Sequence, residues 1–183
     1  MPPNASPRIS VIIPTYGRPR FLDEALTSVV SQSYSAHEII VVDDCSPEPI
    51  ELPTHLRGQV QLIRHVRNQG AGAARNTGLA HATGDFVIFL DDDDLFTPDR
   101  LRVAAVEIGD APMHAMAREK FKSGQTPHWT GGPIFRGDLR ASFPYGRGVG
   151  DHPRMGQVLH RRDSVVQFDP TLRRAQDTEW WIR

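Results

Sequence analysis

The feature that most constrains this chain is a short apolar run that ends in four aspartates. Residues 86–90 (FVIFL) are aromatic or branched aliphatic, and they are followed directly by Asp91, Asp92, Asp93 and Asp94. So short an apolar run predicts a buried β-strand. Adjacent carboxylates repel one another unless positive charge lies close by, and carboxylate oxygens are ligands that Mg²⁺ and Mn²⁺ prefer. The segment therefore predicts a metal site at a strand end, with the metal holding phosphate groups.

The aspartates also have a simpler interpretation. Aspartates cap helices, and the sequence Thr97-Pro98-Asp99 that follows is a plausible helix start, with Pro98 at the first helical position. One or two of the carboxylates could therefore be caps or solvated charges. We favour the metal role because all four follow directly on a buried strand.

The rest of the first half predicts alternating strands and helices. Strands are expected at residues 9–13, 38–42, 60–63 and 86–90, and helices from Pro19, at 73–82 and at 98–106. The first strand is expected to stop at Pro14. Strands that are apolar throughout and joined by helices predict parallel pairing, right-handed crossovers and a sheet covered on both faces. Residues 158–160 and 178–183 suggest a further short strand and a helix, whereas residues 122–153 read as a long irregular stretch.

Composition and charge exclude several classes of protein. A chain of 183 residues fits one domain with a sizeable core, and a net charge of −1 gives no basic footprint for bulk nucleic-acid binding. Cys45 is the single cysteine, so no disulfide can form within this sequence. The N-terminus lacks the apolar run of a signal peptide, and no segment is long enough to span a bilayer. A cytoplasmic location is expected, with peripheral membrane contact left open.

Two further groups are expected to join the acidic cluster. Asp43 and Asp44 end the second strand, and a glycine-bearing loop around Gly70 leads into the helix that carries Arg75. The carboxyl ends of parallel strands share one edge of the sheet, so these groups should line one cleft. Carboxylates can accept hydrogen bonds from ribose or a base, and Arg75 and the loop amides can meet phosphate. Alternatively, Arg75 is a surface ion pair and the glycine at position 72 simply makes a turn.

Three segments carry a resemblance to a known family. SVIIPTYGRPRFLDEAL, EIIVVDDCS and NQGAGAARNTGLAHATGDFVIFLDDDD are similar to the N-terminal half of family 2 glycosyltransferases with the GT-A fold. The resemblance implies a Rossmann-like α/β fold with a mostly parallel sheet flanked by helices. It also implies a nucleotide-sugar donor, expected to be a UDP-sugar, Mn²⁺ or Mg²⁺ on a D-x-D motif, and inverting transfer to a hydroxyl. The acceptor would be a glycan, a lipid-linked sugar or a small molecule.

The resemblance also divides the single domain. Residues 1–105 are expected to form the donor-binding half, and residues 106–183 the more irregular acceptor-binding half. Because the sequence ends within a helical pattern, a C-terminal element is expected to be missing.

The same resemblance assigns roles at the first two strand ends. Pro14, Thr15 and Tyr16 match the loop that holds the nucleotide base, with Tyr16 stacking on it. Asp44 matches the residue that bonds uracil, and Asp43 lies beside it.

The resemblance also assigns residues that would bind the metal and the donor. Arg75 matches a position near the donor. Asp91 and Asp93 fit the D-x-D spacing, with Asp93 in direct contact with the metal, and Asp92 is expected to face the ribose or the donor sugar.

The acceptor side is less regular. RRAQDTEWWIR resembles the segment E-D-x-D/E-x-W-x-x-R, which maps the catalytic base onto Asp177, with Glu179 as the runner-up. Gln176 stands where the family usually has Glu. Alternatively, Asp177 only caps a terminal helix. His152 and His160 could complete the metal shell, although lone histidines are more often surface residues.

The sequence leaves two other functions open. In the first, the chain is a non-catalytic nucleotide-sugar-binding module, which the departure at Gln176 favours. In the second, it is a sugar nucleotidyltransferase, which also uses strand-end aspartates and a metal. The second is disfavoured because the sequence lacks the lysine-bearing glycine-rich signature expected of that class.

Overall fold

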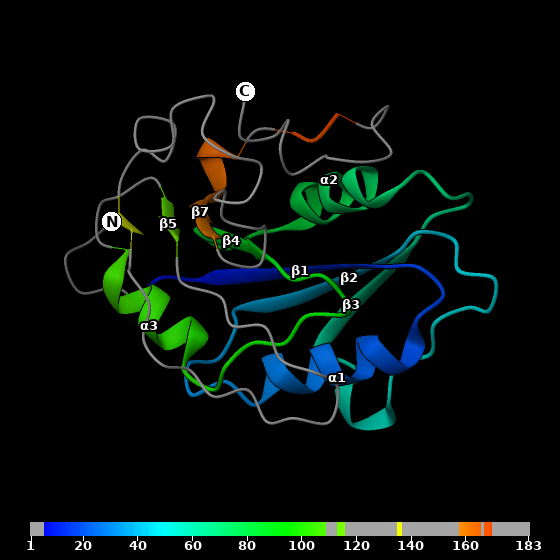
Figure 1. Cartoon of the computed structure of the whole chain (residues 1–183), viewed down its shortest axis with the longest axis horizontal. Coiled ribbons are helices and arrows are strands. Elements are labelled where there is room, and N and C mark those ends of the chain that lie inside the picture. Colours follow the sequence, from blue (N-terminus) through cyan, green and yellow to red (C-terminus); the bar gives the residue numbers. More distant parts are fainter. Residues whose placement is uncertain (1–5, 109–112, 116–134, 137–157, 166, 170–183) are drawn as a thin grey trace, which may run out of the picture.

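The described part of the chain forms one mixed sheet with helices on both faces (Figure 1). The computed structural model describes residues 6–108, 113–115, 135–136, 158–165 and 167–169. The strands are β1 (Ile9–Thr15), β2 (Glu38–Asp43), β3 (Val60–Arg64), β4 (Phe86–Phe89), β5 (Met113–Ala115), β6 (Phe135–Arg136) and β7 (Val158–Arg161). The helices are α1 (Pro19–Val30), α2 (Ala71–His81) and α3 (Arg100–Glu107), with 3-10 turns at Thr54–Leu56 and Arg162–Ser164.

The order of the strands places a crevice beside β1. Across the sheet the order is β3-β2-β1-β4-β7-β5-β6. The first four run parallel, as the sequence predicts, and β7, β5 and β6 are each antiparallel to their neighbours. From β1 the chain winds outward to β2 and β3, then returns through α2 to β4 on the other side of β1. In α/β sheets, ligands bind at the carboxyl ends of the strands where the winding direction reverses.

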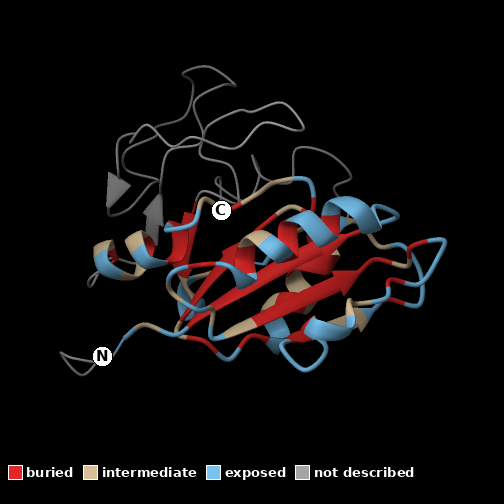
Figure 2. Ribbon diagram, turned by 90° about the horizontal axis from the view of Figure 1, so that it is seen from below, coloured by how far each residue is buried: buried red, intermediate tan, exposed pale blue. Residues whose placement is uncertain are grey.

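Both faces of β1, β2 and β4 are buried, whereas the edge strand β3 is partly exposed. The central sheet is therefore covered on two sides, as predicted. One cluster joins side chains of α1 and α3 to residues such as Ile13 and Ile88. The other joins Ala74 of α2 to Ile12 and Phe89 on the opposite face. Figure 1 shows α1 and α3 below the sheet and α2 above it, and Figure 2 shows the central strands buried along their length.

The first helix shows how local sequence determines this arrangement. Pro19 occupies the first turn, where its missing N–H costs no hydrogen bond. Leu22, Ala25, Leu26 and Val29 are buried at helical spacing, so one apolar stripe of α1 faces the sheet. The helix therefore begins directly after the loop that follows β1, and the residues of this loop lie at the crevice.

The expected end of the first strand was wrong. Instead of stopping before Pro14, β1 continues to Thr15, and Pro14 pairs in register with Val42 of β2. Ile12 accepts a hydrogen bond from the amide of Leu90, and Thr15 accepts one from that of Asp44. Backbone groups of successive strand residues point alternately to the two neighbouring strands. The backbone nitrogen of Pro14 points to the side of β4, which has already ended at this level, so its missing N–H removes no hydrogen bond of the sheet.

The other expected elements inside the described residues occur within a few residues of their predicted bounds. The helix expected at 178–183 lies outside the described residues, as does nearly all of the stretch 122–153, in which β6 is the described part. Across the portion that the structure describes, no helix combines the length and apolar character needed to cross a membrane.

Close contact between α2 and β1 gives a stability prediction. A Cβ atom added at Gly78 of α2 would overlap Cγ2 of Ile12. Gly78→Ala should therefore destabilise the fold by about 1–3 kcal/mol, although alanine favours an isolated helix by up to about 1 kcal/mol. Urea unfolding of Gly78→Ala, Ile12→Ala and the double variant gives the interaction energy. The penalty should shrink when Ile12 is truncated, and strictly additive effects would contradict the proposed overlap.

Candidate active site

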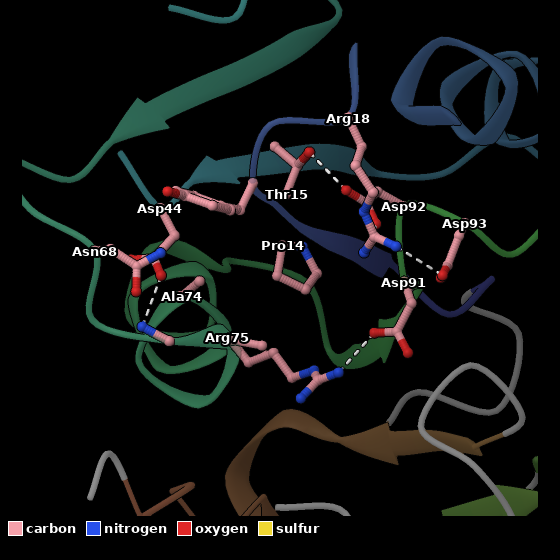
Figure 3. Close-up of a pocket in the computed structure, with 13 residues that line it drawn as sticks. Pro14, Thr15, Arg18, Asp44, Asn68, Ala74, Arg75, Asp91, Asp92 and Asp93 are labelled. Atoms are coloured by element: carbon pink, nitrogen blue, oxygen red, sulfur yellow. Dashed lines mark hydrogen bonds and ion pairs between the residues drawn. The ribbon is translucent and has the colours of Figure 1, made fainter. Parts of the chain in front are cut away.

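A cavity of about 330 Å³ opens at the carboxyl ends of β1, β2 and β4, next to the start of α2 (Figure 3). The residues that line it come from three strand ends, two loops and the first turns of α2: Pro14, Thr15, Tyr16, Arg18, Asp44, Asn68, Gly70, Ala71, Ala74, Arg75, Asp91, Asp92 and Asp93. The cavity therefore lies where the winding of the sheet reverses, as the strand order requires.

Asp92 is the buried centre of the acidic cluster. Its side chain is fully enclosed, with an exposed fraction of 0%. The Thr15 hydroxyl donates a 2.7 Å hydrogen bond to Oδ2, and Arg18 Nη2 lies 2.5 Å from Oδ1. Burial raises the pKa of the Asp92 carboxyl, while the Thr15 hydrogen bond and the Arg18 charge act in the opposite direction. Asp92 thus links the ends of β1 and β4.

Asp93 shares the same guanidinium. Arg18 Nη1 donates a 2.8 Å hydrogen bond to Asp93 Oδ2, and both side chains are about half exposed. Partial burial tends to lower the pKa of Arg18, but the charges of Asp92 and Asp93 outweigh it and raise that pKa. One arginine, from the loop after β1, therefore holds two carboxylates from the end of β4.

Asp91 pairs with a second arginine, which is held more rigidly. Arg75 Nη2 donates a 2.6 Å hydrogen bond to Asp91 Oδ1, and the Arg75 guanidinium carbon lies 5.4 Å from the centre of the Phe168 ring. Phe168 packs edge-on against Phe89, and its backbone N–H and carbonyl both bond to the side chain of Asn76. Arg75 is therefore fixed between β4, its own helix and the segment around Phe168.

Asp44 orders the loop that leads into α2. Its carboxylate accepts hydrogen bonds from the amides of Gln69 (2.9 Å) and Gly70 (2.6 Å), and His65 Nδ1 lies 2.7 Å away. His65 Nε2 in turn lies 2.8 Å from the Thr77 hydroxyl. Gly70 has a φ of +93°, a conformation that favours glycine. The charge of Asp44 therefore holds the Gly70 turn against the cavity.

The predicted partner of Asp44 lies outside the cavity. Asp43 is buried but does not line it; its carboxylate accepts hydrogen bonds from the amide and hydroxyl of Ser46 and pairs with Arg64. The Ser46 hydroxyl also accepts a bond from the Gly17 amide. Asp43 thus shapes the loops after β1 and β2, and its expected contact with the nucleotide stays a prediction.

The acidic cluster has a donor set that suits a divalent ion with additional ligands. Among the described residues, Asp91, Asp92 and Asp93 share the two guanidinium groups of Arg18 and Arg75. Asp91 is about one-third exposed and Asp93 about half exposed, so both can reach a ligand in the cavity. Within the described residues, no group of three or more His, Cys, Asp or Glu side chains is arranged to hold a metal. Mg²⁺ and Mn²⁺ commonly take one or two protein carboxylates and complete their shell with phosphate and water, so the residues present fit such an ion.

The other predicted site residues divide into two groups. Pro14, Thr15, Tyr16, Asp44, Arg75 and the first three aspartates of the cluster are brought to one cavity, and their roles there remain predictions. Asp177 lies outside the described residues, as do Gln176, Glu179 and His152.

His160 does not reach the aspartates. It is buried on β7 opposite Val87, well before the acidic end of β4, and burial lowers its pKa to about 3. The idea that it completes a metal shell was therefore wrong.

Sequence reasoning missed two polar lining residues, Arg18 and Asn68, and the packing residue Phe168. The signal for Arg18 was present: it is a basic residue directly after a strand whose neighbour ends in aspartates. Phe168 carried no local signal, because its place depends on a contact with α2 across 92 residues of chain.

Comparison with known proteins agrees with this geometry. The family model described as glycosyl transferase family 2 matches residues 10–154, well over half of the chain. The succinoglycan biosynthesis protein ExoW of Rhizobium meliloti is 43% identical over 102 residues, which cover 51% of this chain and 32% of ExoW.

Two solved structures share the fold. TarS of S. aureus in complex with UDP has a TM-score of 0.68 at 23% identity, over 96% of this chain and 54% of that one. The mannosyltransferase PcManGT of Pyrobaculum calidifontis, in complex with GDP-Man and Mn²⁺, has a TM-score of 0.66 at 20% identity, over 97% of this chain and 52% of that one. This chain thus spans 32% of ExoW, 54% of the TarS fragment that was solved with UDP and 52% of the PcManGT chain.

The architecture is that of a GT-A glycosyltransferase. With the family model matched over most of its length, the chain belongs to glycosyl transferase family 2.

The contacts of Asp44 predict a stability effect that is independent of any ligand. Asp44→Asn places an NH₂ group opposite the Gln69 or the Gly70 amide in either orientation, so one buried donor loses its acceptor. The variant should lose about 1–3 kcal/mol in the free energy of unfolding, measured with urea. Asp93→Asn is the matched control, because its half-exposed ion pair should cost less than about 1 kcal/mol. Equal losses in the two variants would contradict the structural role of Asp44.

Proposed function

We propose that the chain carries the donor site of a metal-dependent glycosyltransferase. The enzyme moves a sugar from a nucleoside-diphosphate sugar, a UDP-sugar by preference, to an acceptor hydroxyl with inversion. The observation that carries the proposal is the joint presence, around one cavity, of the Asp91–Asp93 carboxylates, two arginines and the Gly70 turn. Membership of glycosyl transferase family 2 supports it, as do the UDP bound to TarS and the GDP-Man and Mn²⁺ bound to PcManGT.

The parts of the cavity suit the parts of such a donor. Tyr16 is half exposed at the rim and offers a ring on which a base can stack. Asp44 has carboxylate lone pairs beyond those used by the loop amides, and they can accept a bond from a base N–H. The start of α2 at Ala71 and the guanidinium of Arg75 line the same cavity, and both can interact with phosphate charge.

Bond cleavage in a sugar nucleotide produces negative charge on the diphosphate. Asp91 and Asp93 would hold the divalent ion, which when bound neutralises part of that charge as the diphosphate departs. Arg75 is already oriented by Phe168 and Asp91, so little reorganisation is needed for it to assist. Thr15 and Arg18 keep the buried Asp92 in place beside these groups.

The acceptor side of the proposal rests on Asp177. An aspartate on the face opposite the leaving group can accept the proton of the attacking hydroxyl, and one displacement then inverts the anomeric carbon without a protein nucleophile. Residues 106–183 would contribute this half of the site. Gln176, which stands in place of the family's Glu, favours a second candidate, a nucleotide-sugar-binding module without transfer activity.

A thermal-shift panel tests the donor site. UDP, GDP and ADP are compared at equal concentration with and without Mn²⁺. UDP with Mn²⁺ at about 100 times its dissociation constant should raise the melting temperature by roughly 5–10 °C. The metal-dependent part of this shift should vanish in Asp93→Ala. Equal shifts with all three nucleotides would contradict a preference for uracil, and the absence of any shift would contradict the donor site itself.

Replacement of the proposed base separates a transferase from a binding module. Asp177→Asn should abolish sugar release from UDP-sugars in the presence of Mn²⁺, because no group would take up the proton. Binding of UDP should stay nearly unchanged in calorimetry. Release of sugar by neither form would favour the binding module, and equal losses of binding and release would show that Asp177 has a structural role.

A further inference from the structure

Arg18 occupies the position where added positive charge would be expected in a metal-bound site. Its guanidinium lies between Asp92, at 2.5 Å, and Asp93, at 2.8 Å, at the edge of the cavity (Figure 3). Asp93 is one of the two carboxylates that would hold the ion. The arginine therefore already neutralises this side of the cluster in the absence of a ligand.

The two arginines of the site differ in how firmly they are held. The Arg75 side chain is 6% exposed and lies against the Phe168 ring as well as Asp91. The Arg18 side chain is 46% exposed, and among the described residues its guanidinium is held by carboxylates alone. It belongs to the loop before α1, so a change of rotamer can move its head group without disturbing a helix or strand. Arg18 is thus the cation of the pair that can be displaced.

A divalent ion at Asp93 would compete with the Arg18 guanidinium, which contacts Oδ2 of the same carboxylate. An arginine remains protonated in proteins, so it cannot relieve the repulsion by losing a proton. Two positive groups a few ångströms apart repel each other strongly near a protein surface, where the effective dielectric constant is about 20. The repulsion favours movement of the guanidinium away from Asp93, and a diphosphate in the cavity would offer it a new anionic partner.

We propose that Arg18 is an exchangeable counterion of Asp93: it pairs with Asp93 in the free protein and yields this carboxylate to the divalent ion. Its Nη2 stays on the buried Asp92, and its Nη1 turns to the nucleotide diphosphate. The proposal rests on the proposed function of the same cavity. This exchange would make metal binding and nucleotide binding depend on each other. Without nucleotide, the metal has to displace Arg18 from Asp93 and the guanidinium gains no new contact. With the diphosphate present, the displaced arginine gains a phosphate contact, and the two ligands bind cooperatively.

The test compares two arginines that are two residues apart. Arg18→Met removes the counterion while keeping a side chain of similar length. Arg20→Met is the matched control, since the Arg20 side chain is 88% exposed and, among the described residues, pairs with Glu24 on its own helix. The Mn²⁺ dissociation constant is measured by electron paramagnetic resonance without nucleotide, and the UDP dissociation constant by calorimetry in saturating Mn²⁺. Neither readout depends on activity.

Arg18→Met should bind Mn²⁺ alone about tenfold more tightly than wild type, because no guanidinium has to be displaced. The same variant should bind UDP in saturating Mn²⁺ about tenfold more weakly, because the phosphate contact is lost. Arg20→Met should change neither constant by more than about twofold. Mn²⁺ affinity in Arg18→Met that is equal to or weaker than that of wild type would overturn the proposal, and so would undetectable Mn²⁺ binding in both proteins.

Arg18→Lys is a second variant for the case that Arg18→Met does not fold, since lysine keeps a positive charge near the buried Asp92. A lysine cannot contact two carboxylates with the fork geometry of arginine, so Mn²⁺ affinity should rise by a smaller factor than in Arg18→Met. An unchanged Mn²⁺ affinity in a folded Arg18→Lys would count against the exchange. Failure of the proposed function looks different: wild type would then bind no nucleoside diphosphate with or without Mn²⁺.

Discussion

The pairing of aspartates with arginines at the end of β4 is the interaction on which the site depends. A strand buried on both faces delivers four carboxylates to one point, and Asp92 among them is shielded from water. Within the described part of the chain, Thr15, Arg18 and Arg75 stabilise this cluster by supplying hydrogen bonds and positive charge at short range. The same arrangement leaves Asp91 and Asp93 partly exposed to the cavity, which favours a divalent cation.

The fold brings these partners together from distant parts of the chain. Register between β1 and β4 sets Thr15 beside the acidic end, and the loop after β1 carries Arg18 over the same carboxylates. Asp44 at the end of β2 holds the turn before α2, the helix that carries Arg75. Each contact joins segments that meet only because parallel strands end at one edge of the sheet. The cavity is therefore a consequence of the winding order rather than of any single motif.

Much of the first half could be predicted because its signals are local. Apolar runs identified the parallel strands, the periodicity from Leu22 to Val29 identified α1, and the position of the aspartates identified the site. The local sequence is insufficient where the structure of a segment depends on a residue that is distant in the chain. Pro14 stays in β1 because β4 ends earlier beside it, and Asp43 faces Ser46 and Arg64 instead of the cavity.

The strands β5 and β6 illustrate the same limit. They are three and two residues long, and their pairing partners lie far along the chain, so neither composition nor period could reveal them. The anchoring of Arg75 by Phe168 is likewise a contact between segments that are remote in sequence.

The most direct test of the central claim is to locate a bound Mn²⁺ ion from the paramagnetic broadening of backbone amide signals in the presence of UDP. The account predicts that broadening is strongest at Thr15, Gly70 and the aspartates that follow β4. It should be weakest at the opposite ends of the strands, where Arg8 pairs with Asp85. Broadening that is strongest at the Arg8–Asp85 end, or uniform along the sheet, would contradict a metal-assisted diphosphate site at the carboxyl edge.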